Sequence, residues 1–142
     1  KDSSYQAMFI TVILGKINLE KKEMEFINMG HEPMMVLDPN FNFEYVKSTL
    51  PPMGLMPVKD ESFFKTTTMD ISDKTILIYT DGVTEGYVDE GKELEVAGLE
   101  SEIKKLHTTS PQTIITHVTK ILTEKGFTLR DDITALGIKI NF

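Results

Sequence analysis

The sequence predicts an α+β fold, and three features of its 142 residues predict it. The first half consists of short apolar and β-branched runs separated by turn residues, a pattern typical of strands. Residues 96–125 carry apolar side chains at three- to four-residue spacing, which is typical of amphipathic helices. Residues 136–140 return to the period of two that indicates a strand. Strands followed by a helical pair and a returning strand favour an α+β domain.

Six strands are expected before the helices, and each is bounded by turn residues. They cover residues 8–14, 24–28, 34–37, 41–46, 63–69 and 75–80. The last of these is almost wholly apolar, so we expect a fully buried strand. Residues 50–57 contain three prolines and a glycine, which predicts an ordered crossing loop.

Two helices are expected after the strands. The first covers residues 96–106, and the second covers residues 111–125, with Ser110 as its N-cap and Pro111 at its first position. Gly126 is placed for a left-handed cap at the C-terminal end. Because both apolar stripes must be buried, we expect the helices to pack side by side on one sheet. His107 and His117 are expected to face solvent.

Composition restricts the class of protein. The length fits one domain, residues 1–142. No apolar run is long enough to span a bilayer, and we expect no membrane contact by this domain. The net charge of −7 argues against binding to nucleic-acid phosphates, which needs clustered Lys and Arg. Cysteine is absent, which excludes disulfides and thiolate chemistry and favours a cytoplasmic protein.

Two acidic motifs stand where an apolar strand meets a turn. Residues 79–85 read Tyr-Thr-Asp-Gly-Val-Thr-Glu, and residues 130–134 read Arg-Asp-Asp-Ile-Thr. Carboxylates at strand ends stay ionised only when they are solvated, paired or bound to a cation. Hard divalent ions prefer such oxygen ligands. The motifs therefore predict a metal site in which Asp81 and Asp131, distant in sequence, lie close in space.

These motifs resemble those of the PPM-type, protein phosphatase 2C-like, metal-dependent serine/threonine phosphatases. The similarity is greatest to the branch of the stage II sporulation phosphatase and the stress-response regulatory phosphatases. Further matches in the same order are residues 8–11, residues 28–33 with Gly-His-Glu-Pro, and residues 50–55 with Pro-Pro-Met-Gly-Leu. Agreement of several separated motifs is more specific than any one of them.

The resemblance implies a four-layer α-β-β-α sandwich of antiparallel sheets. It also implies two Mn²⁺ or Mg²⁺ ions in the complete domain, with Asp81 and Asp131 as ligands. Water activated by the metals would then hydrolyse phosphoserine or phosphothreonine without a covalent enzyme intermediate. The implied substrate is a phosphorylated regulatory protein of the anti-sigma-factor antagonist type. Such domains serve as outputs of bacterial signalling proteins.

The sequence departs from the family at its start. Family members carry an earlier Gly-Asp-Phe-x-Asp segment, followed by two helices, and residues 1–6 contain no replacement. We therefore expect the domain to be incomplete at its N-terminus, without that strand and those helices. The sheet that they would cover should expose an apolar patch above the roughly 300–600 Å² usual for a monomer. We expect a chain of this kind to associate, for example as a homodimer.

Four further residues are candidates for supporting roles at this site. Gly82 is expected to let the backbone turn sharply beside the ion. Asp132 would point away from Asp131 if both lay in one strand, and would then orient bound water. Glu85 either supports the ligands or makes a surface contact, and His31 either acts as a general acid or only fixes its turn. The pattern favours the structural reading for His31.

Two other functions compete with this interpretation. A haloacid-dehalogenase-type phosphatase needs an aspartate nucleophile two residues before Asp81, and Tyr79 stands there. The stronger alternative is a non-catalytic binding or regulatory module with a phosphatase-like fold, which the absent aspartate segment would favour. The enzyme is the preferred interpretation.

Overall fold

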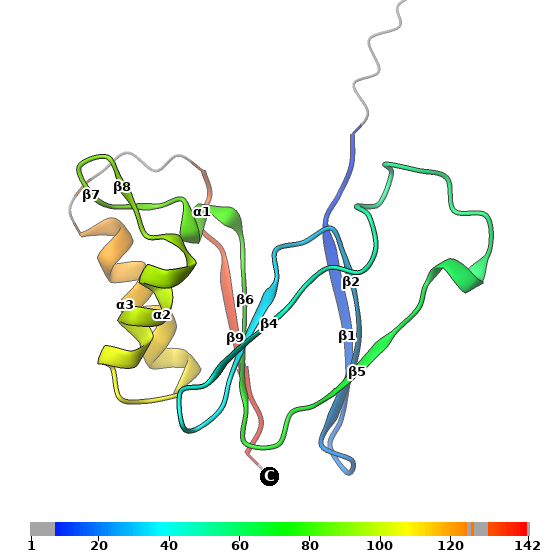
Figure 1. Cartoon of the computed structure of the whole chain (residues 1–142), viewed down its shortest axis with the longest axis horizontal. Helices are drawn as coiled ribbons and strands as arrows, with labels where there is room; N and C mark the ends of the chain where they lie inside the picture. Colours follow the sequence, from blue (N-terminus) through cyan, green and yellow to red (C-terminus); the bar gives the residue numbers. More distant parts are fainter. Residues whose placement is uncertain (1–7, 125, 127–130, 142) are drawn as a thin grey trace, which may run out of the picture. The chain divides into compact units, whose positions relative to one another are not determined.

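The computed structural model describes residues 8–124, 126 and 131–141, which form two compact units (Figure 1). The first unit contains the described residues up to His31 together with Lys47–Ser72. The second contains Glu32–Val46 and the described residues from Asp73 onward. Neither unit is continuous in sequence, so each depends on contacts between distant segments.

An antiparallel sheet of three strands, in the order β1-β2-β5, forms the first unit. Its strands are β1 (Val12–Asn18), β2 (Glu23–Met29) and β5 (Thr67–Asp70), and a 3₁₀ turn, η1 (Glu61–Phe63), precedes β5. Asn18 sets the β1–β2 turn, because its Oδ1 accepts hydrogen bonds from the N–H groups of Glu20 and Lys21. Met24 and Phe26 are buried at alternate positions of β2, as a sheet with one covered face requires.

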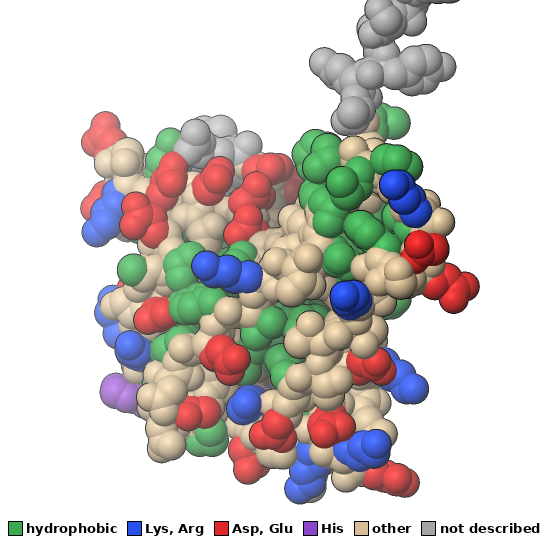
Figure 2. Space-filling model, turned by 45° about the vertical axis from the view of Figure 1, so that its right-hand side comes forward, with side chains coloured by type: hydrophobic (Ala, Val, Ile, Leu, Met, Phe, Trp, Pro, Cys, Tyr) green, Lys and Arg blue, Asp and Glu red, His purple; other side chains and the backbone are tan. Residues whose placement is uncertain are grey.

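Hydrophobic side chains remain exposed on the first unit. It holds ten of the twelve large hydrophobic side chains that are exposed among the described residues, and Figure 2 shows such side chains gathered there. They are Met8, Phe9, Ile10, Leu14, Leu19, Met53, Leu55, Met56, Val58 and Phe64. A concentration of this kind is typical of an interaction surface, whereas scattered exposed residues are not.

A four-stranded antiparallel sheet, in the order β4-β3-β6-β9, forms the centre of the second unit. Its strands are β3 (Met34–Leu37), β4 (Phe43–Val46), β6 (Thr75–Tyr79) and β9 (Ala135–Lys139). The pairing of β6 with β9 runs from Thr75 opposite Lys139 to Tyr79 opposite Ala135. The two inner strands are the most buried, since every residue of β3 and all but one of β6 are inaccessible.

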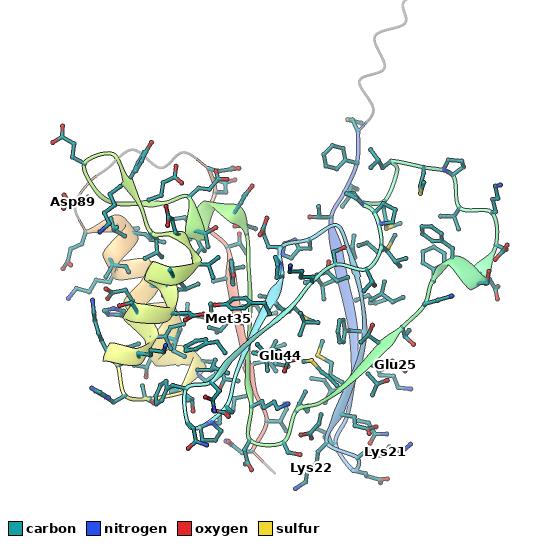
Figure 3. The ribbon with its side chains drawn as sticks, in the orientation of Figure 1. Lys21, Lys22, Glu25, Met35, Glu44 and Asp89 are labelled. Atoms are coloured by element: carbon teal, nitrogen blue, oxygen red, sulfur yellow. The ribbon has the colours of Figure 1, made fainter. Side chains whose placement is uncertain are left out.

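Two helices, α2 (Glu95–Lys105) and α3 (Pro111–Thr123), lie side by side along this sheet (Figure 1). Met35 points from β3 toward them (Figure 3) and belongs to the core that they share with the sheet. The other buried members of that core are Leu37, Leu77, Tyr79, Val83, Leu94, Leu99, Ile103, Ile114, Val118 and Leu122. The predicted packing of a helical pair on one sheet is confirmed.

The caps of α3 follow the sequence prediction. The Ser110 hydroxyl accepts a hydrogen bond from the N–H of Thr113, and Pro111 is the first helical residue. Gly126 has a positive φ of 67°, as a left-handed cap requires. His117 differs from expectation: its side chain is only 27% exposed, because Glu102 of α2 binds its Nε2 at 2.8 Å. This contact joins the two helices.

Four short elements were not predicted. They are the 3₁₀ turn η1, the one-turn helix α1 (Asp81–Thr84), and the hairpin of β7 (Tyr87–Asp89) and β8 (Lys92–Glu93). Each is too short for a periodic pattern. The strand expected at residues 63–69 begins only at Thr67, because Phe63 ends η1. The first strand also begins later than expected, because Ile10 pairs with Met53 in an isolated bridge. No helix among the described residues has the length and apolar composition needed to cross a membrane.

Replacing Gly137 by alanine is expected to destabilise the second unit. The added Cβ would lie 2.6 Å from Cβ of Pro111 and 3.1 Å from Cδ1 of Ile115, so α3 and β9 would have to separate. Overpacking of this kind costs about 1–3 kcal/mol. As a control, Leu136→Ala shortens an exposed side chain and should cost less than about 1 kcal/mol. Urea unfolding compares the two variants, and equal stability would show that β9 does not present Gly137 to α3.

Candidate metal centre

The first acidic motif leads from β6 directly into α1. The carbonyl of Thr80 accepts a hydrogen bond from Val83 N–H at 3.0 Å, and the carbonyl of Asp81 accepts one from Glu85 N–H at 2.8 Å. Asp81 is the first residue of the helix and is exposed, and its Oδ1 accepts the N–H of Gly82 at 2.9 Å. The backbone at Asp81 is therefore fixed on both sides, while its carboxylate faces solvent.

The second acidic motif lies beside the first. Asp131 and Asp132 precede β9, which begins at Ala135, and the carbonyl of Thr134 accepts the N–H of Thr80 at 3.0 Å. Both aspartates are exposed, and Asp131 Oδ1 accepts the N–H of Asp132 at 2.7 Å. The strand pairing thus brings two segments about fifty residues apart to the same end of the sheet, as the motifs predict.

Gly82 is required for a different reason from the one expected. It lies in α1 rather than in a sharp turn, and it is buried. A Cβ added there would overlap the carbonyl oxygen of Asp132 and lie 3.1 Å from the carbonyl carbon. Glycine therefore permits the close approach of the two acidic segments.

Asp131 and Asp132 do not lie in a strand, contrary to the expectation that would have turned their side chains to opposite faces. Asp131 lies in a bend, and Asp132 follows it before β9. Alternation of side chains holds only for extended, paired backbone. The role of Asp132 beside the ligands stays a prediction.

Oxygen donors that suit a hard divalent cation are present at this end of the sheet. Mg²⁺ in proteins is held by one or two carboxylates, and water or substrate phosphate completes its shell. Two aspartates on adjacent segments fit that requirement. Within the part of the chain that the structure describes, no group of three or more His, Cys, Asp or Glu side chains is arranged to hold a metal. The assignment of Asp81 and Asp131 as ligands therefore stays a prediction.

Negative charge gathers at this end of the second unit, as a cation site requires. Figure 2 shows acidic side chains gathered at the end of the second unit that carries α1 and the β7–β8 hairpin, and Asp89 projects outward from that hairpin (Figure 3). The first motif also contains the buried Tyr79. Burial, together with the negative charges of Glu32 and Glu100, raises the pKa of its hydroxyl to about 12. Tyr79 is therefore neutral at physiological pH.

The two remaining candidates make local contacts. His31 belongs to the first unit, where its N–H donates to Asn28 Oδ1 at 3.0 Å and its Nδ1 lies 3.2 Å from Thr11 Oγ1. Glu85 ends α1 with an exposed side chain. A supporting role for either residue stays a prediction.

Thr80 is the residue of this site that sequence reasoning missed. Its hydroxyl lies 3.1 Å from both the carbonyl oxygen of Asp132 and the amide nitrogen of Thr134. The local signal was slight: a β-branched hydroxyl residue at the end of a buried strand, immediately before an aspartate.

Comparison with known proteins identifies a matching family and two relatives. A family model described as stage II sporulation protein E (SpoIIE) matches residues 1–141. Protein IcfG of Synechocystis sp. is 39% identical over 80 residues, which are 56% of this chain and 12% of that protein. Phosphoserine phosphatase RsbP of Bacillus subtilis is 28% identical over 75 residues, 53% of this chain and 18% of that protein. The chain thus matches less than a fifth of either relative.

Solved structures show the same fold. The PP2C phosphatase domain of SpoIIE from Bacillus subtilis, solved with a fragment of its regulatory domain, aligns with a TM-score of 0.72 and 20% identity over 92% of this chain and 37% of that one. A manganese-presoaked form of the SpoIIE domain aligns with a TM-score of 0.68 and 19% identity, over 93% of this chain and 56% of that one. RsbX in complex with magnesium aligns with a TM-score of 0.58 and 22% identity, over 89% of this chain and 54% of that one. These similarities confirm the α+β fold with antiparallel sheets that the sequence predicted.

Replacing Gly82 by alanine is expected to force the two acidic segments apart. Because the obstacle to the new Cβ is backbone, no side-chain rotation relieves it, and the free energy of unfolding should fall by about 1–3 kcal/mol. Gly98→Ala is a matched control, since its Cβ would meet only the Leu94 side chain, 3.1 Å away. Thermal unfolding of both variants measures the difference. A Gly82→Ala protein as stable as the parent would contradict the close approach.

Proposed function

This chain belongs to the stage II sporulation protein E (SpoIIE) family, and we propose that it is a metal-dependent protein serine/threonine phosphatase domain. The proposed reaction is hydrolysis of phosphoserine or phosphothreonine on a regulatory protein. The observation that carries the proposal is the pairing of β6 with β9, which sets Asp81 beside the segment of Asp131. The similarity to PP2C domain structures supports it.

In the proposed mechanism, Asp81 and Asp131 would hold Mn²⁺ or Mg²⁺, with two ions in the complete domain. A bound divalent ion supplies an activated water and stabilises charge on the phosphoryl oxygens. The chain's own task is to position the two carboxylates. Exposure at the sheet end keeps both carboxylates hydrated, and the hydrogen-bonded backbone at Asp81 limits the reorganisation that this residue needs for binding.

For the substrate we propose a phosphorylated regulatory protein of the anti-sigma-factor antagonist type, in the cytoplasm. The support is the relative described as a phosphoserine phosphatase. We also propose that the chain is the output domain of a bacterial signalling protein, because the similar SpoIIE phosphatase domain is joined to a regulatory domain of that protein.

A non-catalytic phosphatase-like module is the second candidate. The specific observation in its favour is that the described residues contain no three-ligand group for a metal. Such a module would bind a partner protein and would not hydrolyse phosphoserine or phosphothreonine. Measured phosphatase activity therefore decides between the two functions.

Asp81→Asn in the intact protein is expected to abolish Mn²⁺-dependent hydrolysis of a phosphoserine protein or peptide. The amide keeps the shape of the side chain but loses its charge and half of its oxygen donors. Asp73→Asn is the control, because Asp73 is an exposed aspartate at a turn with a φ of 56°, a conformation that asparagine also tolerates. Release of phosphate with and without Mn²⁺ is the measurement.

Full activity of Asp81→Asn would rule out the metal-ligand role of that residue. Absence of hydrolysis by the parent protein at any Mn²⁺ or Mg²⁺ concentration would instead favour the non-catalytic module. Circular dichroism of both variants confirms that each has kept its fold.

We also propose that the isolated chain forms a homodimer or a larger assembly through the exposed hydrophobic side chains of the first unit. Leu14, at 68% exposed on β1, is a suitable position to test because it lies in a regular strand. Sedimentation at micromolar concentration should show association that Leu14→Lys weakens. A monomeric parent chain would contradict the proposal.

A further inference from the structure

The side chain of Thr80 spans the gap between the two acidic segments. Thr80 follows the last residue of β6, and its N–H donates to the Thr134 carbonyl at 3.0 Å, which continues the sheet by one more contact. Its hydroxyl oxygen accepts the N–H of Thr134 at 3.1 Å. The same hydroxyl donates to the carbonyl oxygen of Asp132, also at 3.1 Å.

This hydroxyl therefore uses both its donor and its acceptor capacity on one short stretch of backbone. A hydroxyl has one proton to donate, and the second carbonyl near it, that of Thr134, is farther away at 3.5 Å. The shorter contact to Asp132 is thus the better donor interaction. The Thr80 hydroxyl is thus hydrogen-bonded to the backbone on both sides of Ile133, at Asp132 and at Thr134.

The segment before β9 has limited support from the core. Ile133 is partly buried and packs against the core of the second unit, whereas Asp131, Asp132 and Thr134 are exposed. Exposed loop backbone is the part of a fold that opens most readily. A bridge from Thr80 is well placed to limit that motion, because Thr80 directly precedes Asp81.

We propose that Thr80 is a positioning residue for the metal centre: its hydroxyl holds the Asp131–Asp132 segment against α1, so that Asp81 and Asp131 present their carboxylates to the same ion. This inference rests on the proposed function. Thr80 does not bind the ion in this account; it sets the spacing of the groups that do. Loss of residues that orient metal ligands commonly lowers metal affinity about 10- to 100-fold.

Two substitutions of Thr80 distinguish the effect of its hydroxyl from the effect of its side-chain shape. Thr80→Val keeps the β-branched shape that suits the end of a strand and removes the hydroxyl. Thr80→Ser keeps the hydroxyl. Should Thr80→Val fail to fold, Thr80→Ala removes the same hydroxyl with a smaller side chain.

Thr75→Val is the matched control. Thr75 begins the same strand, and its hydroxyl also donates to a backbone carbonyl, that of Thr109, at 2.7 Å. It lies at the opposite end of β6 from the acidic motifs and is fully buried. Its loss should lower thermal stability and leave metal affinity unchanged, which is the behaviour of a purely structural hydroxyl.

Calorimetric titration of the intact protein with Mn²⁺ is the main measurement. We expect Thr80→Val to bind Mn²⁺ about 10-fold or more weakly than the parent, Thr80→Ser to bind within a few-fold of it, and Thr75→Val to match it. Hydrogen exchange provides a second readout that needs no metal. The amide of Thr134 should exchange faster in Thr80→Val than in Thr80→Ser.

The outcomes distinguish this inference from the proposed function. If Asp81→Asn abolishes Mn²⁺ binding but Thr80→Val binds as the parent does, the positioning role is wrong and the proposed function stands. If Asp81→Asn binds Mn²⁺ like the parent, the metal-ligand assignment is wrong, and the inference falls with it. Unchanged exchange of the Thr134 amide in Thr80→Val would overturn the bridge itself.

Discussion

The antiparallel pairing of β6 with β9 is the interaction on which the site and its surroundings depend. It runs over five residue pairs and continues past them through the contact of Thr80 with Thr134. Its register decides which residues meet at the end of the sheet. A slip of one residue would turn Gly137 away from α3 and move the Asp131 segment relative to Asp81, because successive side chains of a strand face opposite sides.

The two helices need a sheet face that is shielded from water, whereas the acidic segments need a sheet end that is open to it. Along one side, α2 and α3 cover it with a dry core that fixes β6 and β9. At the end of the sheet, beyond the last strand pair, the aspartates remain in solvent, where ionised carboxylates are stable. The core supplies rigidity and the sheet end supplies hydration, and a site for a hard cation needs both.

Much of this arrangement could be predicted from the sequence. Period and capping residues located α2, α3 and most strands, and the two motifs with the family resemblance indicated Asp81 and Asp131. Short elements such as α1 and the β7–β8 hairpin were missed because they have no periodic pattern. The reason for Gly82 and the bridge from Thr80 could not be predicted, since both depend on backbone more than forty residues away. Strand alternation could not be used to orient Asp132, because its segment is not a strand.

We propose that this sheet end binds a divalent cation between the two acidic segments. Crystals of the intact protein soaked in Mn²⁺ and measured near the manganese absorption edge test this binding. We expect an anomalous peak within about 2.5 Å of carboxylate oxygens from both Asp81 and Asp131. A peak bound to other residues, or no peak while both aspartates are ordered, would contradict it.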